Sequence, residues 1–184
     1  MPKINIVNIV LSGHIHRFIP LDLIASKVEN VQYNPEEFPG LIIRLKDPKT
    51  TIILFSTGKI GLTGCLPKMR IERVISTINI EFKKINFKLP SKIDFNIENI
   101  VAMIDIGFKL NLDKVGIILK DFEYDPHQFP GIIYRISNFI MCFLIFSSGK
   151  IIIVGAKNNK ELREQTEKLL NILKVLKPNK IHKK

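Results

Sequence analysis

The sequence contains no tryptophan and only two cysteines, Cys65 and Cys142, among its 184 residues. The cysteines lie far apart and form no C-x-x-C pair, so neither a zinc site nor a disulfide framework is indicated. The longest apolar runs, such as residues 140–146, are much shorter than the ~20 residues that a membrane-spanning helix needs. Residues 1–13 also lack the uninterrupted apolar stretch of a signal peptide. We therefore expect a reducing, intracellular protein with no membrane partner.

Acidic side chains are in the minority. The chain has 28 lysines and arginines against 17 aspartates and glutamates, and its net charge is +11. The excess is +6 in residues 1–91 and +5 in residues 92–184, so it belongs to the body of the protein and not to a tail. A basic body favours a polyanionic partner such as nucleic acid. The apolar content of 46% is high enough to predict a globular fold.

Sequence motifs that support catalysis are also missing. The two Gly-Lys pairs, at 58–59 and 149–150, lack the earlier glycine of a phosphate-binding loop and are followed by isoleucine. His14 and His16 have a spacing found in metal sites, but no further ligands cluster with them, which favours an ordinary pair in a loop. We expect no enzyme activity, no cofactor and no metal.

An internal repeat dominates what is present. Residues 34–40 read NPEEFPG, and residues 125–131, 91 positions later, read DPHQFPG. The same shift aligns LFSTGK with IFSSGK and needs no gap. We therefore divide the chain into a first repeat, residues 1–91, and a second repeat, residues 92–184, closely joined in one domain. Two copies are too few for a solenoid.

Both repeats predict the same order of elements, which is a strand, a short helix, four strands and a long helix. In the first repeat these are expected at residues 4–11, from 20–22 onward, and at 31–33, 41–46, 50–56, 59–63 and 69–84. In the second repeat the opening strand is expected at 97–104, the short helix from 111–113 onward and the long helix at 159–176. The result is a strand-rich α+β fold with pseudo-two-fold symmetry.

Two of the expected strands pose a packing problem. TTIILF at 50–55 and MCFLIF at 141–146 are apolar on both faces, whereas an antiparallel strand with one wet face alternates apolar and polar residues. Two helices per repeat can cover only one face, and soluble monomers seldom leave a broad apolar surface without a partner. A second sheet, a second copy of the chain in a homodimer, or nucleic acid could cover it. The basic charge favours nucleic acid, met through apolar contacts with positive charge at the rim.

The doubled order F-P-G, R, F-S-x-G-K, with its spacing of 91 residues, resembles the core domain of the TATA-box-binding proteins, and their archaeal form in particular. The likeness runs from about Ile4 to Leu176. It implies a saddle, in which a curved antiparallel sheet lies on the DNA minor groove and four helices cover the convex face. It also implies a general transcription initiation factor that binds and bends A/T-rich TATA-box promoters, cytoplasmic in an archaeal cell or nuclear in a eukaryotic one.

The resemblance assigns roles to individual residues in the groove. Four phenylalanines would form two wedge pairs, each prising open a base step: Phe38 with Phe55, and Phe129 with Phe146. Two asparagines would donate to the minor-groove acceptors of adenine and thymine: Asn8 and Asn99. An apolar floor would exclude the amino group of guanine, and its matched positions are Val10, Val101, Ile53 and Leu144. Further minor-groove contacts are implied at Gly61, Ile152, Thr63 and Val154.

The two half-sites implied by the resemblance are unequal. Thr63 is matched by Val154 and Gly61 by Ile152, so the floor beneath Gly61 should be shallow. Phosphate contacts at the rim are implied for Arg44, Arg135, Lys59, Lys150, Ser56, Thr57, Ser147 and Ser148.

In the family, carboxylates of the second F-P-G loop help to hold a transcription factor B-type partner, through which RNA polymerase joins. The matching positions are Asp125 and His127, so one carboxylate is kept and the other is replaced by an imidazole. Two alternative functions stay open. One is a divergent paralogue that acts as a regulator or promoter-selective factor. The other is a DNA- or RNA-binding module of a nucleic-acid enzyme. We expect the complete pair of repeats, with no catalytic segment attached, to argue against this second alternative.

Overall fold

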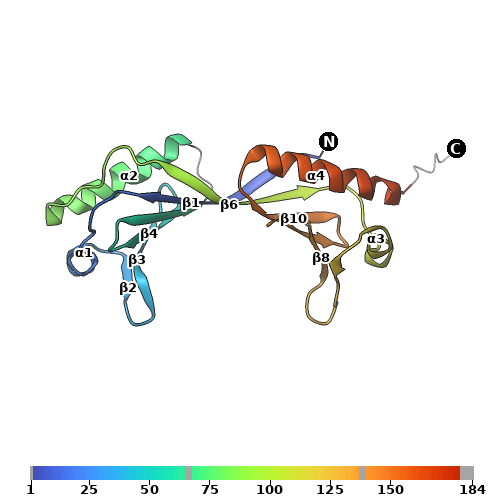
Figure 1. Ribbon diagram of the computed structural model, residues 1–184, viewed down its shortest axis with the longest axis horizontal. Coiled ribbons are helices and arrows are strands. Elements are labelled where there is room, and N and C mark those ends of the chain that lie inside the picture. The colour runs from blue at the N-terminus through green and yellow to red at the C-terminus, as the bar shows by residue number, and fades with distance from the viewer. Residues whose placement is uncertain (1, 65–67, 137–139, 179–184) are drawn as a thin grey trace. The chain divides into compact units, whose positions relative to one another are not determined.

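A computed structural model describes residues 2–64, 68–136 and 140–178 of the chain (Figure 1). These residues form ten β-strands and four α-helices. They fall into two compact units, an N-terminal unit of residues 8–98 and a C-terminal unit of residues 1–7 and 99–184. The division of the sequence repeats at residue 91 stays a prediction. Cys65 lies outside the described residues.

The N-terminal unit has five antiparallel strands in the spatial order β2-β3-β4-β5-β1. Its elements are β1 (Asn5–His14, whose first three residues belong to the other unit), α1 (Leu21–Lys27), β2 (Val31–Asn34), β3 (Phe38–Leu45), β4 (Thr50–Phe55), β5 (Lys59–Gly64), α2 (Lys68–Phe82) and the 3₁₀ helix Lys83–Ile85. The long helix therefore begins one residue before its predicted start and ends in a tighter turn.

The C-terminal unit repeats this arrangement with the strand order β6-β10-β9-β8-β7. Its elements are β6 (Phe95–Asp105, whose first four residues belong to the other unit), α3 (Leu112–Ile118), β7 (Phe122–Glu123), β8 (Gly131–Arg135), β9 (Cys142–Phe146), β10 (Lys150–Ala156), α4 (Asn159–Leu173) and the 3₁₀ helix Lys174–Leu176. The predicted α+β class, with an antiparallel sheet, four helices and two repeats of like order, is confirmed.

Asparagine side chains start both helices of the C-terminal unit. The Oδ1 atom of Asn111 accepts the backbone N–H of Lys114 at 3.0 Å, and that of Asn158 accepts the N–H of Glu161 at 2.8 Å. Glu161 reaches back to accept the N–H of Lys157 at 3.1 Å. Such reciprocal capping satisfies donors that have no partner within the helix, and it places the beginning of α4 where the sequence predicts it.

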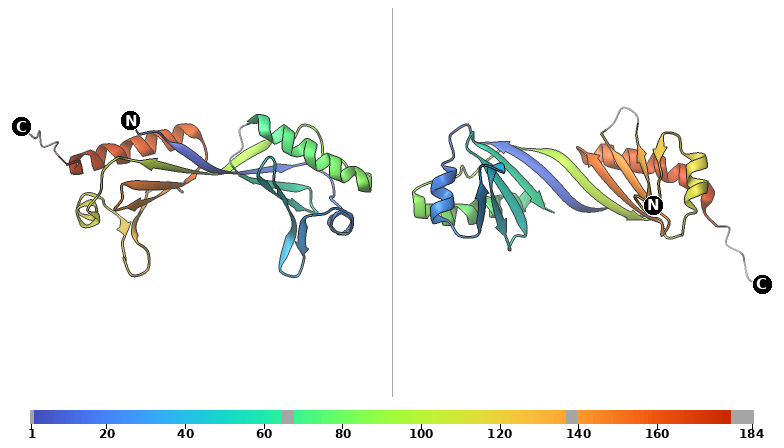
Figure 2. Two further views of the ribbon diagram at one scale, coloured as in Figure 1. Left: turned by 180° about the vertical axis from the view of Figure 1, so that it is seen from behind. Right: turned by 90° about the horizontal axis from the view of Figure 1, so that it is seen from below.

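The core of the N-terminal unit lies between its two helices and one face of its strands. The buried α2 residues Val74, Ile78 and Phe82 join a cluster with Ile24 of α1 and inward-facing strand residues such as Ile52. Both helices therefore cover the same face. Within this unit the β2–β3 hairpin extends away from α2, as two views show (Figure 1, Figure 2).

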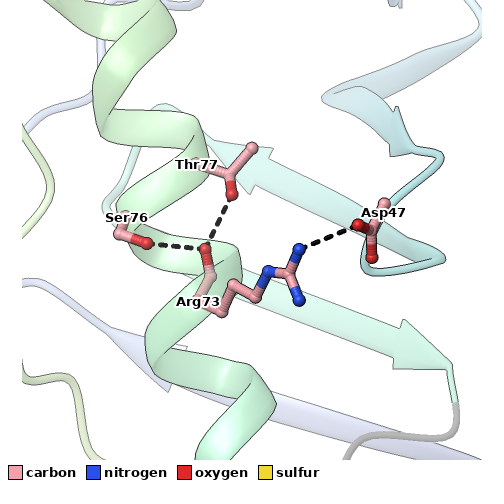
Figure 3. Close-up of polar contacts among 4 residues, drawn as sticks. All are labelled: Asp47, Arg73, Ser76 and Thr77. Atoms are coloured by element: carbon pink, nitrogen blue, oxygen red, sulfur yellow. Dashed lines mark hydrogen bonds and ion pairs between the residues drawn. The ribbon is translucent and has the colours of Figure 1, made fainter.

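A polar contact joins α2 to the turn after β3 (Figure 3). Nη2 of Arg73 donates to Oδ2 of Asp47 at 2.8 Å, while the hydroxyls of Ser76 and Thr77 donate to the carbonyl of Arg73 at 2.8 and 2.9 Å. The charged side chains are 62% and 76% exposed. Exposed pairs contribute at most about 1 kcal/mol, so apolar burial is what holds this helix on the sheet.

Candidate nucleic-acid interface

The strands that are apolar on both faces have one buried and one half-buried face. Alternate residues are buried along β4 and β9, and those between them are partly exposed. We call the half-buried, helix-free side of each sheet the open face. Its central residues are Val10, Ser12, Ile42, Ile53, Gly61 and Thr63 in the N-terminal unit, and Val101, Met103, Ile133, Leu144, Ile152 and Val154 in the C-terminal unit.

Strand register aligns these residues in rows across each sheet. One row of the N-terminal unit is Ile42, Ile53, Gly61 and Ser12. The equivalent row of the C-terminal unit is Ile133, Leu144, Ile152 and Met103. Cross-strand partners point to the same face, so the predicted floor residues of each repeat lie together. A Cβ atom built on Gly61 would find its nearest neighbour, Cβ of Ile53, 3.6 Å away, so the floor is open there.

The two predicted wedge pairs are ring contacts at the end of the open face. The ring centroids of Phe38 and Phe55 are 5.8 Å apart, and those of Phe129 and Phe146 are 5.6 Å apart. Phe38 is 39% exposed and the other three rings are half-buried, because each ring packs against its mate. Phe38 is therefore the most accessible ring of the four.

Glycine of each F-P-G motif leaves room for these rings. A Cβ atom on Gly40 would lie 2.5 Å from Cε1 of Phe38, and one on Gly131 would lie 3.1 Å from Cε1 of Phe129 and from Cδ1 of Phe146. At Gly40 this separation would force the ring of Phe38 to move. At Gly131 the nearest atom is the backbone oxygen of Ile145, at 2.9 Å, and the two rings would have to shift only slightly. A larger residue would therefore displace the Phe38 ring at Gly40 and would press on the β9 backbone at Gly131.

Both predicted groove asparagines have their carbonyl oxygen engaged by the protein. Oδ1 of Asn8 accepts the hydroxyl of Thr63 at 3.2 Å, and Oδ1 of Asn99 accepts the backbone N–H of Gly155 at 2.8 Å. A backbone N–H can only donate, so the orientation of the Asn99 amide is determined. Among the residues that the structure describes, the NH₂ group of each side chain has no acceptor and is left as a donor.

The predicted rim differs between the repeats. Nη1 of Arg44 donates to Oε1 of Gln32 at 3.0 Å, whereas Nε of Arg135 forms an ion pair with Glu123 at 3.3 Å. Five further rim side chains are exposed and Ser56 is half-buried; the exposed ones are Thr57, Lys59, Ser147, Ser148 and Lys150.

The second F-P-G loop is organised by Asp125. Its Oδ1 accepts the backbone N–H of His127 at 3.0 Å, and its Oδ2 accepts Nε2 of Gln128 at 2.9 Å. The remaining carboxylate of this loop therefore stabilises the loop itself. The side chain of His127 is exposed.

Comparison with known proteins identifies the family. The family model described as "Transcription factor TFIID (or TATA-binding protein, TBP)" matches residues 3–85 and 94–176. The chain belongs to this family.

Relatives match over almost the whole chain. The chain is 38% identical over 173 residues to the TATA-box-binding protein of Methanocaldococcus jannaschii, covering 94% of each sequence. It is 40% identical over 171 residues to that of Pyrococcus furiosus, covering 93% of this chain and 90% of the relative. A solved structure described as Methanococcus jannaschii TBP matches with a TM-score of 0.85 and 37% identity, covering 95% of this chain and 99% of that one.

Membership of this family makes the chain a transcription factor and not an enzyme, as the sequence predicts. The described residues contain no cluster of three or more His, Cys, Asp or Glu side chains that could hold a metal ion. Within the same residues no helix has the length and apolarity to cross a membrane.

Sequence reasoning missed several residues of the open face. Cys142 pairs with Arg135 on one side and with Val154 on the other, so its thiol belongs to the same face. Burial raises the pKa of this thiol, and the nearby guanidinium of Arg135 partly offsets the effect. Gln32 and Glu123, which hold the rim arginines, were also missed. Strand alternation combined with the repeat would have located all three.

Proposed function

We propose that the chain binds the minor groove of A/T-rich TATA-box promoter DNA, kinks it at two base steps and so nucleates assembly of the transcription initiation complex. The observation that carries the proposal is the matched pair of phenylalanines in each repeat, packed over a glycine beside a half-buried apolar face. A flat apolar ring can enter a base step without leaving a polar group unpaired, which offsets part of the unstacking cost.

The centre of each open face suits A·T pairs. Adenine N3 and thymine O2 are acceptors, whereas guanine adds an N2 amino donor in the minor groove. The free NH₂ groups of Asn8 and Asn99 fit the acceptors. Apolar residues such as Ile53 and Leu144 would desolvate a guanine amino group without offering it an acceptor. The basic rim would meet the phosphates, which makes affinity fall with salt.

Binding to three duplexes tests this proposal: a TATA-like box, a G·C-substituted box, and a box in which inosine·cytosine replaces each G·C pair. Inosine lacks the N2 amino group, so we expect the inosine duplex to bind nearly as well as the A·T box and the G·C duplex to bind at least tenfold more weakly. Energy transfer between dyes at the duplex ends should report a bend. Equal binding of all three duplexes would refute minor-groove selection.

A transcription factor B-type protein, and RNA polymerase through it, would join at the second F-P-G loop. His127 stands there where Glu36 stands in the first repeat. If the partner surface is basic, His127→Glu should strengthen the ternary complex several-fold and leave binary DNA binding unchanged.

The matched control for this partner contact is Glu36→His in the first loop, which should have no effect on the ternary complex. A loss with Glu36→His instead would indicate that the partner uses the first repeat. No change with either variant would mean that the partner uses neither loop, which would favour the paralogue interpretation. Without DNA, a second copy of the chain is the occupant that the apolar open face would accept.

A further inference from the structure

A basic cleft lies at the end of β1, where the chain leaves the sheet. It has a volume of about 540 Å³, and its lining includes His14, His16, Lys59, Lys92 and Asp94. Two lysines and two imidazoles face a single carboxylate there. None of the lysines or the aspartate forms an ion pair within the part of the chain that the structure describes. The cleft is therefore positively lined and its charges are available to a ligand.

The hydrogen bond that the His14 ring accepts fixes which of its nitrogens is the donor. Its Nδ1 accepts the backbone N–H of His16 at 2.8 Å. Because a backbone N–H can only donate, the hydrogen of the neutral ring is on Nε2. A Cβ atom on Gly58 would lie 3.2 Å from Cε1 of His14, so the ring packs on the β4–β5 turn. That turn carries the predicted rim residues Thr57 and Lys59.

The second repeat builds the same turn with opposite chemistry. Oδ1 of Asp105 accepts the backbone N–H of Gly107 at 2.8 Å, as Nδ1 of His14 does for His16. Asp105 pairs across the sheet with Lys150, whereas His14 pairs with Lys59. The carboxylate of Asp105 attracts the lysine beside it and would repel a phosphate. The imidazole N–H of His14 instead provides a second donor beside the lysine, which a phosphate could use.

We propose that His14, with Lys59 and Lys92, binds a backbone phosphate of the DNA next to the box, so that the first repeat contacts a longer stretch of DNA than the second. The opposing charges near the site are few. Asp94 is one, and Glu98 is held by the hydroxyl of Ser12 at 2.5 Å. This inference rests on the proposed function, because the ligand is the phosphodiester backbone of the same DNA.

The test compares salt dependence on a box duplex with long flanks for three variants. His14→Asp introduces the residue found at this position in the second repeat. Its carboxylate should make the slope of log affinity against log salt less steep by roughly 0.9, the value for one phosphate contact. His14→Asn keeps an acceptor for the turn and adds no charge, so it should keep the slope and lose roughly threefold to tenfold in affinity. Asp105→Asn should raise the slope by about one contact.

A second duplex, which ends at the box, tests the location of the phosphate. It should bind the unsubstituted protein and His14→Asp equally well. A loss with His14→Asp that persists on this short duplex, or unchanged slopes for all folded variants on the long one, would overturn the proposal.

The last experiment adds inorganic phosphate or the flanked duplex and follows the histidine side chains by NMR. A shift of the His14 signals with the flanked duplex but not with millimolar phosphate supports a DNA contact, whereas equal shifts with both would overturn the assignment to DNA. Failure of the proposed function has a different signature, because the unsubstituted protein would then fail to distinguish A·T from G·C duplexes.

Discussion

The two repeats place equivalent side chains in equivalent positions and hold them there with different groups. A side-chain hydroxyl orients Asn8, whereas a backbone N–H orients Asn99. A neutral amide contacts Arg44 and a carboxylate contacts Arg135. The floor row of the N-terminal unit contains glycine and serine where that of the C-terminal unit contains isoleucine and methionine.

The two repeats therefore share the positions of their ring pairs, asparagines and lysines. The groups that hold these side chains in place differ between the repeats. The half-sites should therefore contact DNA in the same places with different strengths. The C-terminal unit has larger apolar side chains in its floor row, and its rim arginine is paired with a carboxylate. The N-terminal unit has glycine and serine in that row, and its rim arginine contacts a neutral amide. Substitutions that exchange supporting groups between the repeats can measure each contribution.

The largest effect is expected from the wedge rings. Phe38→Ala and Phe129→Ala should each weaken box binding by about 10- to 100-fold and reduce bending, since stacking on a base is worth roughly 1–3 kcal/mol. Thermal unfolding should change little. The control is Phe82→Ala in the core, where the ring is 0% exposed and the expected cost is about 3–5 kcal/mol. A wedge variant that is as unstable as this control would show that its ring is structural.

A smaller effect should separate the two asparagines. Thr63→Val makes the first repeat resemble the second at this position and releases Oδ1 of Asn8, so affinity for the box should fall about threefold to tenfold, as for one lost hydrogen bond. Val154→Thr should bring no gain, because Oδ1 of Asn99 already accepts from Gly155. Fluorescence anisotropy with a labelled box measures both. Equal effects of the two substitutions would mean that the supporting donor does not matter.

Cys142 reports on the open face of the C-terminal unit. Its raised pKa leaves less thiolate at neutral pH, so alkylation by iodoacetamide should be slow at pH 7.5 and should accelerate at a higher pH than for an exposed thiol. Box DNA should slow the reaction at every pH. A Cys65→Ser background restricts the label to one site, and mass spectrometry follows it. Alkylation that is unaffected by DNA would place the duplex elsewhere.

The smallest effect concerns the two matched turns. His16 has a φ of 54° and its mate Gly107 has a φ of 78°, both in the left-handed region that glycine adopts without strain. His16→Gly should therefore stabilise the protein by up to about 1 kcal/mol, and Gly107→Ala should destabilise it by about 1 kcal/mol. No atom lies within 4 Å of a Cβ built on Gly107, so packing does not complicate that comparison. Chemical denaturation measures both, and a stability loss with His16→Gly would contradict the argument.

The fold and the family could be predicted from the sequence because their signals are local and repeated. A shift of 91 residues aligns the F-P-G motifs and the Gly-Lys turns, and alternation identifies strands such as β4. The predicted floor residues came from the family resemblance, and strand register brings them to one face of each sheet. The observed strand ends differ from the predicted ones by up to three residues. For example, β1 continues to His14 and β3 begins at Phe38.

The contacts that support Asn99 and His14 could not be predicted, because they depend on details of the backbone. Asn99 meets Gly155 only because the pairing of β10 with β6 shifts between Ile153 and Ala156. No pattern in the sequence predicts that shift in register. The contact between His14 and His16 likewise needs a residue in the left-handed region, which sequence alone favours for glycine and not for histidine.

The half-buried apolar face and the net charge of +11 have a joint consequence for how ionic strength acts on the molecule. Added salt screens repulsion between two like-charged copies and so allows their apolar faces to associate, while it weakens attraction to a polyanion. The same surface would therefore exchange one occupant for the other as salt rises. Under the proposed function, ionic strength would then select between self-association and DNA binding, and the salt range in which the protein works would depend on its lysines as much as on its phenylalanines.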